Sequence, residues 1–230
     1  DTQGKYRLMD ILQMLSNLSG MERLRLSSIE VNEICPEMVD LVVHTKKICP
    51  HFHIPLQSGD NFILKRMNRK YTASQYAEII DNIRSKIDLP SFTTDVMVGF
   101  PGEKDTHFEN TINLCKRAEF SRMHIFPFSV REGTRAGKMP DHCYPHIIKQ
   151  RKAMLETAAD TLSFSYKKQL LNRVAEVLVE VERDTKTNKL CGYSERYIKV
   201  LFDGPDTLKN TITSVRIEEI APSYAMGTLQ

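Results

Sequence analysis

The feature that most constrains the fold is an alternation of strand-like and helix-like segments through the first two thirds of the 230-residue chain. Short β-rich stretches alternate with segments of roughly 10 to 15 residues whose apolar side chains recur at helical spacing. The expected strands are 23–28, 51–56, 94–98 and 123–128, and the expected helices are 6–18, 37–46, 60–67, 73–87 (capped by Thr72), 104–118 and 146–170. This order predicts βαβ units and a parallel sheet, with too few strands for a closed barrel.

Polar and glycine-containing turns directly follow each expected strand. They read SSIE (27–30), QSGD (57–60), GFPGE (99–103) and SVREGT (129–134). In parallel α/β sheets and barrels, ligands bind beyond the carboxyl ends of the strands. All four turns therefore belong to one predicted site.

Asp95 stands inside the stretch TTDVMVGFPGE, where a buried strand is expected. An uncompensated polar group there costs about 2–7 kcal/mol, so a ligand or partner for the carboxylate is expected. Together with Glu30, Gln57 and nearby arginines it supplies what an amino-acid group and a ribose require, a combination that S-adenosylmethionine contains. The alternative is that polar residues at the strand ends only cap the helices that follow. We favour this interpretation for Glu103, whose charge suits the start of the next helix.

The last 60 or so residues change in pattern to short strands separated by turns. Strands are expected at 174–181, 190–194 and 197–202, with a final strand pair over 211–220. About five short strands in this length predict a small OB-like β-barrel, a fold that often binds single-stranded nucleic acid.

Composition sets wider limits. Hydrophobic residues make up 41% and the formal net charge is +3, which permits a nucleic-acid partner without arguing for one. No apolar run approaches the roughly 20 residues that span a bilayer, so no membrane partner is expected. The five scattered cysteines have no zinc or redox spacing, which favours reduced thiols in a cytoplasmic protein.

Three stretches resemble the second half of the radical S-adenosylmethionine domain of the tRNA methylthiotransferases: HIPLQSGDNFILKRMNRKYT (53–72), DVMVGFPGE (95–103) and FSVREGTRAGKM (128–139). NRVAEVLVE (172–180) and CGYSERYIKVLF (191–202) resemble the RNA-binding TRAM domain that ends those enzymes. The resemblance implies the carboxyl-terminal part of a radical SAM (βα) barrel over 1–168 and a TRAM barrel over 169–230. RLRLSSIE (23–30) resembles the branch that acts on N6-threonylcarbamoyladenosine at tRNA position 37.

By this resemblance, Glu30 holds the methionyl ammonium of S-adenosylmethionine and Arg69 its carboxylate. Gln57 and Asp95 hold the ribose hydroxyls. The remaining members of the implied cofactor-binding set are Ser58, Gly99 and Phe100, the last two beside the adenine, and Arg131 in an electrostatic role.

The family's cluster motifs are not in this sequence. Members carry Cys-x3-Cys-x2-Cys for one 4Fe–4S cluster and three further cysteines for a second, and an electron donor reduces them. We therefore expect this chain to be a fragment that lacks the preceding part and is inactive by itself. The resemblance implies that the full-length enzyme cleaves S-adenosylmethionine to a 5′-deoxyadenosyl radical and methylthiolates C2 of the adenine.

In the TRAM-like segment, four cations are candidates for phosphates of the tRNA anticodon arm: Arg173, Lys189, Arg196 and Lys199. Tyr193 and Tyr197 are candidates for stacking on bases. Ordinary surface charge and barrel packing are the competing interpretation for each. Leu171 and Asn172 stand where the family usually has glycine.

Two other functions remain open at this point. One is a non-catalytic RNA-binding protein that has no need of Asp95 or Glu30. The other is a different radical S-adenosylmethionine reaction, such as porphyrinogen oxidation, against which the TRAM-like segment argues.

Overall fold

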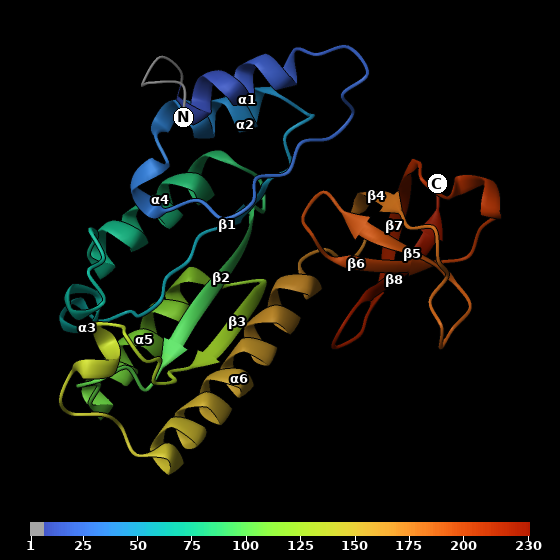
Figure 1. Cartoon of the computed structure of the whole chain (residues 1–230). Coiled ribbons are helices and arrows are strands. Elements are labelled where there is room, and N and C mark those ends of the chain that lie inside the picture. Colours follow the sequence, from blue (N-terminus) through green and yellow to red (C-terminus); the bar gives the residue numbers. More distant parts are fainter. Residues whose placement is uncertain (1–6) are drawn as a thin grey trace. The chain divides into compact units, whose positions relative to one another are not determined.

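A computed structural model describes residues 7–230 of the chain (Figure 1). The chain separates into two compact units, 1–159 and 160–230, and the division falls within helix α6 (Pro145–Lys168). We call them the sheet unit and the barrel unit. Tyr6, the first residue of the first expected helix, lies outside the described residues, and helix α1 spans Leu8–Ser16.

The sheet unit contains a parallel sheet in the order β1-β2-β3, as the alternation of segments predicted. Its strands are β1 (His51–His53), β2 (Ser91–Val98) and β3 (Arg122–Pro127). In register, Asp95 lies opposite His124, and Met97 lies opposite Phe126. Strand β1 is shorter than expected because Pro55 has no N–H to donate to a ladder.

The fourth expected strand, 23–28, is not a strand. It touches its neighbour at two isolated parallel bridges, Leu24 with Ile48 and Ser28 with His53. The reason is that residues 45–50 opposite its first half form turns, so no continuous partner strand exists there. The segment still follows the edge of the sheet, since the N–H of Ile29 donates to the carbonyl of His53 at 3.0 Å.

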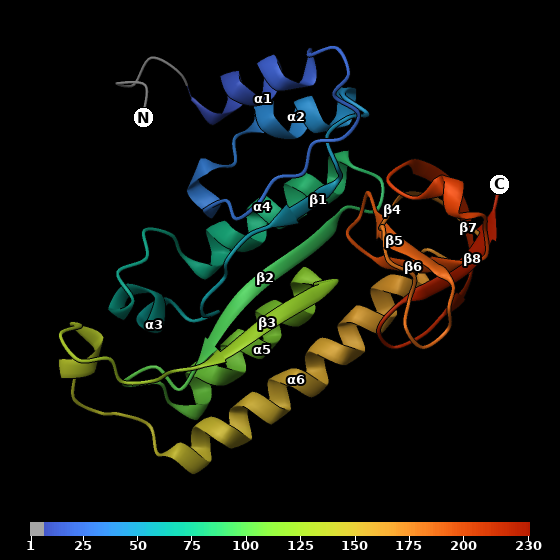
Figure 2. The ribbon, with the colours of Figure 1, turned by 45° about the vertical axis from the view of Figure 1, so that its right-hand side comes forward.

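The helices follow their predicted segments closely: α2 (Pro36–His44), α3 (Asn61–Arg66), α4 (Ala73–Lys86) and α5 (Asp105–Ala118), with short 3-10 turns η1 (Val31–Glu33) and η2 (Ala136–Lys138). Thr72 caps α4 as expected and accepts from the N–H of Gln75. Figures 1 and 2 both show α5 behind β2 and β3. Along the carboxyl half of β2, Val96 and Val98 are fully buried whereas Asp95 and Met97 are partly exposed.

The barrel unit contains a closed barrel in the order β4-β5-β6-β8-β7. Its strands are β4 (Val174–Val179), β5 (Leu190–Ser194), β6 (Lys199–Phe202), β7 (Ile212–Ile220) and β8 (Ala225–Leu229), with a 3-10 turn η3 (Asp206–Leu208). A five-stranded barrel was expected, and the structure has one.

The expected strand pair over 211–220 was wrong, because this stretch is the single strand β7. Its partner β8 lies beyond a turn in which the N–H of Ala221 donates to Tyr224. Strand β8 was not predicted because it contains Gly227, and glycine is uncommon inside strands. A Cβ there would lie 2.0 Å from the carbonyl oxygen of Arg216, so the close approach of β7 and β8 requires glycine.

Asn172, directly before the residue that precedes β4, adopts the left-handed conformation that glycine favours, with φ +64°. Among residues 7–230, no helix is both long and apolar enough to cross a membrane.

Candidate functional site

Gln57 and Asp95 are joined through the main chain at the carboxyl end of the sheet. The N–H of Gln57 donates to the Asp95 carbonyl at 2.8 Å, and the N–H of Met97 donates back to Gln57 at 2.9 Å. Gln57 has φ +61°, and the N–H of Ser58 closes a three-residue turn onto Leu56 at 2.7 Å. Such a turn is rare for a side-chain-bearing residue, and strained backbone of this kind clusters at functional sites.

Asp95 lies on the face of the sheet opposite the buried side chains, and its own side chain is 27% exposed. Its Oδ2 lies 3.4 Å from His53 Nε2, and His53 Nδ1 lies 2.9 Å from the hydroxyl of Thr93. Partial burial lowers the pKa of the neighbouring His124. No lysine or arginine among residues 7–230 forms an ion pair with Asp95, so its carboxylate is available to a ligand.

Glu30 and Arg69 come from distant segments and meet in an ion pair, with Arg69 Nη1 2.7 Å from Glu30 Oε1. Glu30 precedes η1, and Arg69 follows the end of α3. Asn68, with φ +60°, turns the chain there so that the N–H of Arg69 donates to Leu64. Both members of the pair are partly exposed, so a charged ligand can reach them.

A cleft of about 1150 Å³ opens beside these residues. We call it the cationic cleft, and its lining comes from the end of the β1 segment, from α3, from β2 and from the η2 loop. The lining residues are Gln57, Phe62, Lys65, Arg66, Met67, Asn68, Arg69, Lys70, Met97, Phe100, Arg135, Ala136, Lys138, Met139 and Pro140. Gln57, Arg69 and Phe100 thus share one cleft.

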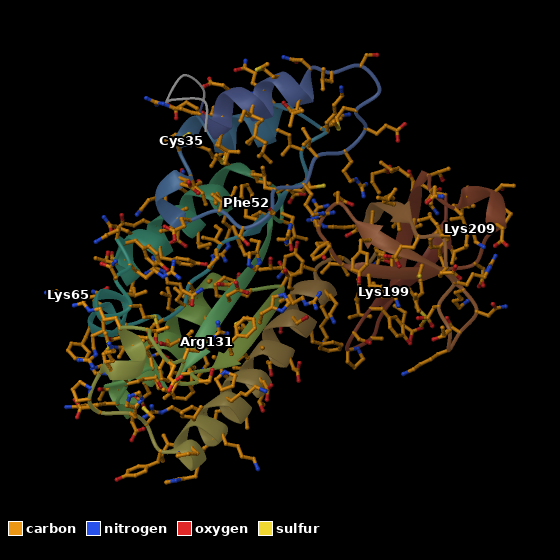
Figure 3. All side chains as sticks on the ribbon, in the orientation of Figure 1. Cys35, Phe52, Lys65, Arg131, Lys199 and Lys209 are labelled. Carbon is orange, nitrogen blue, oxygen red and sulfur yellow. The ribbon has the colours of Figure 1, made fainter. Side chains whose placement is uncertain are left out.

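The other five predicted site residues are not in the lining of this cleft. Glu30 and Asp95 lie at the contacts described above, and the remaining three lie elsewhere. Ser58 is buried, its hydroxyl 3.3 Å from that of Thr111 and accepting from the N–H of Asp60. Gly99 has φ +78°, and a Cβ there would lie 2.4 Å from a side-chain carbon of Ile148, so packing against α6 already requires glycine. Arg131 is exposed in the loop after β3 and is labelled in Figure 3.

Sequence reasoning missed the buried ion pair between Glu103 and Arg151. Their side chains are 2% and 6% exposed, and Arg151 Nη1 lies 2.7 Å from Glu103 Oε1. Burial raises the pKa of Glu103, against the hydrogen bond from the N–H of Gly99. The pair fastens the loop after β2 to α6. Arg151 stands in a helix rich in lysine and arginine, so nothing local marks it as buried.

In the barrel unit, at least three of the four RNA candidates are in ion pairs. Lys189 pairs with Asp203, Arg196 with Glu195, and Lys199 with Asp184 at 2.9 Å. The fourth, Arg173, is exposed and directly precedes β4.

The two candidate tyrosines of the barrel unit stack on each other. The ring centroids of Tyr193 and Tyr197 lie 5.0 Å apart. Base stacking by either ring would have to compete with this contact or extend it.

The cysteines do not fit an iron–sulfur cluster. All five carry free thiols and three of them are buried: Cys49, Cys115 and Cys191. Within the described part of the chain, no three His, Cys, Asp or Glu side chains lie close enough to hold a metal ion. No step of any reaction is therefore assigned to a cluster held by this chain.

The model of the radical SAM superfamily matches residues 4–115, just under half of the chain.

The chain is also similar over most of its length to tRNA methylthiotransferases. It is 36% identical over 210 residues to tRNA-2-methylthio-N(6)-dimethylallyladenosine synthase of Alkaliphilus oremlandii, which covers 91% of this chain and 45% of that protein. It is 36% identical to threonylcarbamoyladenosine tRNA methylthiotransferase MtaB of Bacillus subtilis (92% and 48%) and 39% identical to that of Thermotoga maritima (86% and 45%). The chain spans about half the length of these relatives.

One solved structure, coproporphyrinogen III oxidase (HemN) from Escherichia coli, matches 59% of this chain and 32% of its own. The TM-score is 0.48 at 15% identity, too low to carry an argument.

Proposed function

We propose that this chain supplies the S-adenosylmethionine-binding strand ends and the RNA-binding part of an enzyme that methylthiolates C2 of a hypermodified adenosine at position 37 of tRNA. The observation that carries the proposal is the connected set at the carboxyl end of the sheet. The main chain links Gln57 to Asp95, an ion pair links Glu30 to Arg69, and the cationic cleft contains both Gln57 and Arg69.

Each residue of this set has a definite task. The carboxylate of Asp95 and the amide of Gln57 accept hydrogen bonds from ribose hydroxyls. Glu30 and Arg69 exchange their mutual ion pair for contacts with the ammonium and carboxylate of the methionyl group. Bound S-adenosylmethionine supplies the methyl group and the radical chemistry of the superfamily.

Three further residues of the predicted set have supporting tasks. Phe100 and the backbone of Gly99 flank the adenine. Ser58 acts indirectly: its buried hydroxyl accepts from the N–H of Asp60 and fixes the turn that follows Gln57. Arg131 adds positive charge to the loop beside the cleft.

The nucleoside substrate we propose is N6-threonylcarbamoyladenosine. The proposal rests on the segment 23–30, since relatives named for either nucleoside match this chain at the same 36% identity. Mass spectrometry of nucleosides from a strain that lacks the full-length protein tests it. Loss of the methylthio form of the threonylcarbamoyl nucleoside supports the proposal, and loss of only the dimethylallyl form contradicts it.

Binding of S-adenosylmethionine tests the site itself. In equilibrium dialysis with the radiolabelled compound, Asp95→Asn weakens binding about tenfold, the effect of one charged hydrogen bond. Glu109→Gln removes an exposed carboxylate from α5 and serves as the matched control, with unchanged binding. Equal affinity of Asp95→Asn and the control overturns the assignment.

We expect no turnover from the chain by itself, because no side chains among residues 7–230 form a ligand set for a cluster. An assay with added iron, sulfide and reductant tests this: methylthiolated RNA produced by the 230-residue chain contradicts the proposal.

A further inference from the structure

The cationic cleft carries six positive side chains and no carboxylate in its lining: Lys65, Arg66, Arg69, Lys70, Arg135 and Lys138. They come from two separate segments, the α3 region and the η2 loop, so they do not arise from one charged helix face. Figure 3 labels Lys65 on α3. The fold therefore brings positive charge from two separate segments together in this cleft.

Within residues 7–230, Arg69 is the one member of this set with a carboxylate partner, Glu30. Lys70 Nζ donates to the amide oxygen of Asn68 at 3.0 Å. Arg66 Nε donates to the carbonyl of Pro101 at 3.0 Å, and its guanidinium lies over the ring of Phe62. These neutral partners hold the side chains without cancelling their charge.

Lys65, Arg135 and Lys138 have no ion pair anywhere within residues 7–230. Like charges facing one cleft repel each other, and an anionic ligand with several charges relieves that repulsion. An amino-acid carboxylate bound at Arg69 uses only one of the six cations. The cleft is thus suited to a larger ligand with more than one negative charge.

The same cleft also has apolar walls, among them Phe62, Met97, Phe100 and Met139. Cations that follow a backbone, combined with aromatic and apolar surface for bases, are the elements of single-stranded nucleic-acid binding. A free phosphate has no use for the apolar surface.

We propose that Lys65, Arg135 and Lys138 bind backbone phosphates of the RNA substrate, and that this cleft is the main electrostatic contact between chain and RNA. The inference rests on the proposed function for the identity of the RNA. It assigns the phosphates to the sheet unit, whereas the sequence pointed to the barrel unit.

Salt-dependent binding of a fluorescent anticodon stem-loop to the 230-residue chain tests the proposal. The triple variant Lys65→Ala/Arg135→Ala/Lys138→Ala loses about a hundredfold in affinity, because three charged contacts are removed. The slope of log K against log salt falls by about 2, the change for three phosphates on single-stranded RNA.

The matched control is Lys46→Ala/Lys116→Ala/Lys149→Ala, three exposed lysines of the same unit outside the cleft. It changes net charge equally and leaves affinity within about twofold, since charges beyond a Debye length are screened. A cleft variant that behaves like this control overturns the proposal. So does complete displacement of the RNA by millimolar pyrophosphate, which marks the cleft as a site for small phosphates.

Dialysis with S-adenosylmethionine separates this inference from the proposed function. The triple cleft variant binds S-adenosylmethionine as the unmodified chain does, because Gln57, Arg69 and Asp95 remain. Normal RNA binding by the triple variant, with a loss of cofactor in Asp95→Asn, refutes the inference and leaves the proposed function standing.

Discussion

The cationic cleft and the barrel unit both present lysines and arginines, and they differ in how these are paired. In the cleft, Lys65, Arg135 and Lys138 have no carboxylate partner within residues 7–230. In the barrel, Lys189 and Lys199 each have one. A paired cation must give up its partner before it can bind a phosphate, so the comparison ranks the cleft above the barrel for RNA.

One barrel pair, Lys199 with Asp184, involves a carboxylate that is held in its charged form. Hydrogen bonds from Lys199 and Thr187 hold the pKa of Asp184 at about 2, so this carboxylate stays charged at any physiological pH. Asp184 therefore competes with any phosphate for Lys199. This competition cannot be predicted by counting basic residues in the sequence, because the pairing arises only in the folded barrel.

Stability gives the largest expected difference between the two units. Glu103→Gln removes the buried carboxylate from Arg151 and leaves it only the exposed carboxylate of Asp105, 2.7 Å from Nη2. Breaking a buried pair in this way costs about 3–5 kcal/mol. Hydrogen exchange of peptides from 91–118 should accelerate, while peptides from 174–229 keep their protection. Equal acceleration in both units contradicts the view that this pair fastens the sheet unit alone. Glu109→Gln is the control with unchanged exchange.

Between pH 7 and pH 5, acid should also act on the sheet unit alone, because all seven histidines lie before residue 160. Burial lowers the pKa of His51 from its ordinary 6.5 to about 3. As pH falls below 6.5, His51 becomes protonated in the unfolded chain but stays neutral in the folded chain. Its contribution to the free energy of unfolding is therefore fully present above pH 6.5 and is lost progressively down to about pH 3. By pH 5 the loss is about 2 kcal/mol.

Urea unfolding at pH 7 and pH 5 measures this loss. His51→Gln should flatten the difference between the two pH values, and a barrel probe such as the exchange of β7 peptides should show none. A full pH dependence that survives in His51→Gln contradicts the assignment.

The smallest expected effect is on RNA affinity when the barrel lysines lose their carboxylate partners. It tests whether this pairing is what makes the barrel the weaker RNA site. Asp184→Asn/Asp203→Asn frees Lys199 and Lys189 from their partners. RNA affinity should then rise a few-fold, since each freed cation adds a phosphate contact at the barrel surface. Fluorescence anisotropy of the same stem-loop measures it. Unchanged affinity would show that the barrel does not approach the phosphates at all.

Periodicity predicted the regular elements well. The helices α4 and α5 and the strand β2 follow directly from apolar spacing, and Thr72 is a capping residue readable from the sequence. Periodicity failed for two segments whose structure depends on contacts with distant parts of the chain. The segment 23–28 alternates like a strand but has no continuous partner, and β8 contains a glycine that only strand packing explains.

The candidate site divides in the same way. Asp95 was conspicuous because a charge inside an apolar strand needs a reason. The Glu30–Arg69 contact was unreadable from spacing, since 39 residues separate its members. The pairing of Lys189 and Lys199 was equally hidden, because their partners come from neighbouring turns of the folded barrel.

Lysine footprinting with and without RNA tests the account most directly. The chain is acetylated with a limiting amine-reactive reagent in the presence or absence of the anticodon stem-loop, and each lysine is quantified by mass spectrometry. The account predicts that RNA protects Lys65 and Lys138 strongly and Lys189 and Lys199 weakly, with Lys116 unchanged as the internal control. Protection confined to Lys189 and Lys199 would contradict it and return the RNA contact to the barrel.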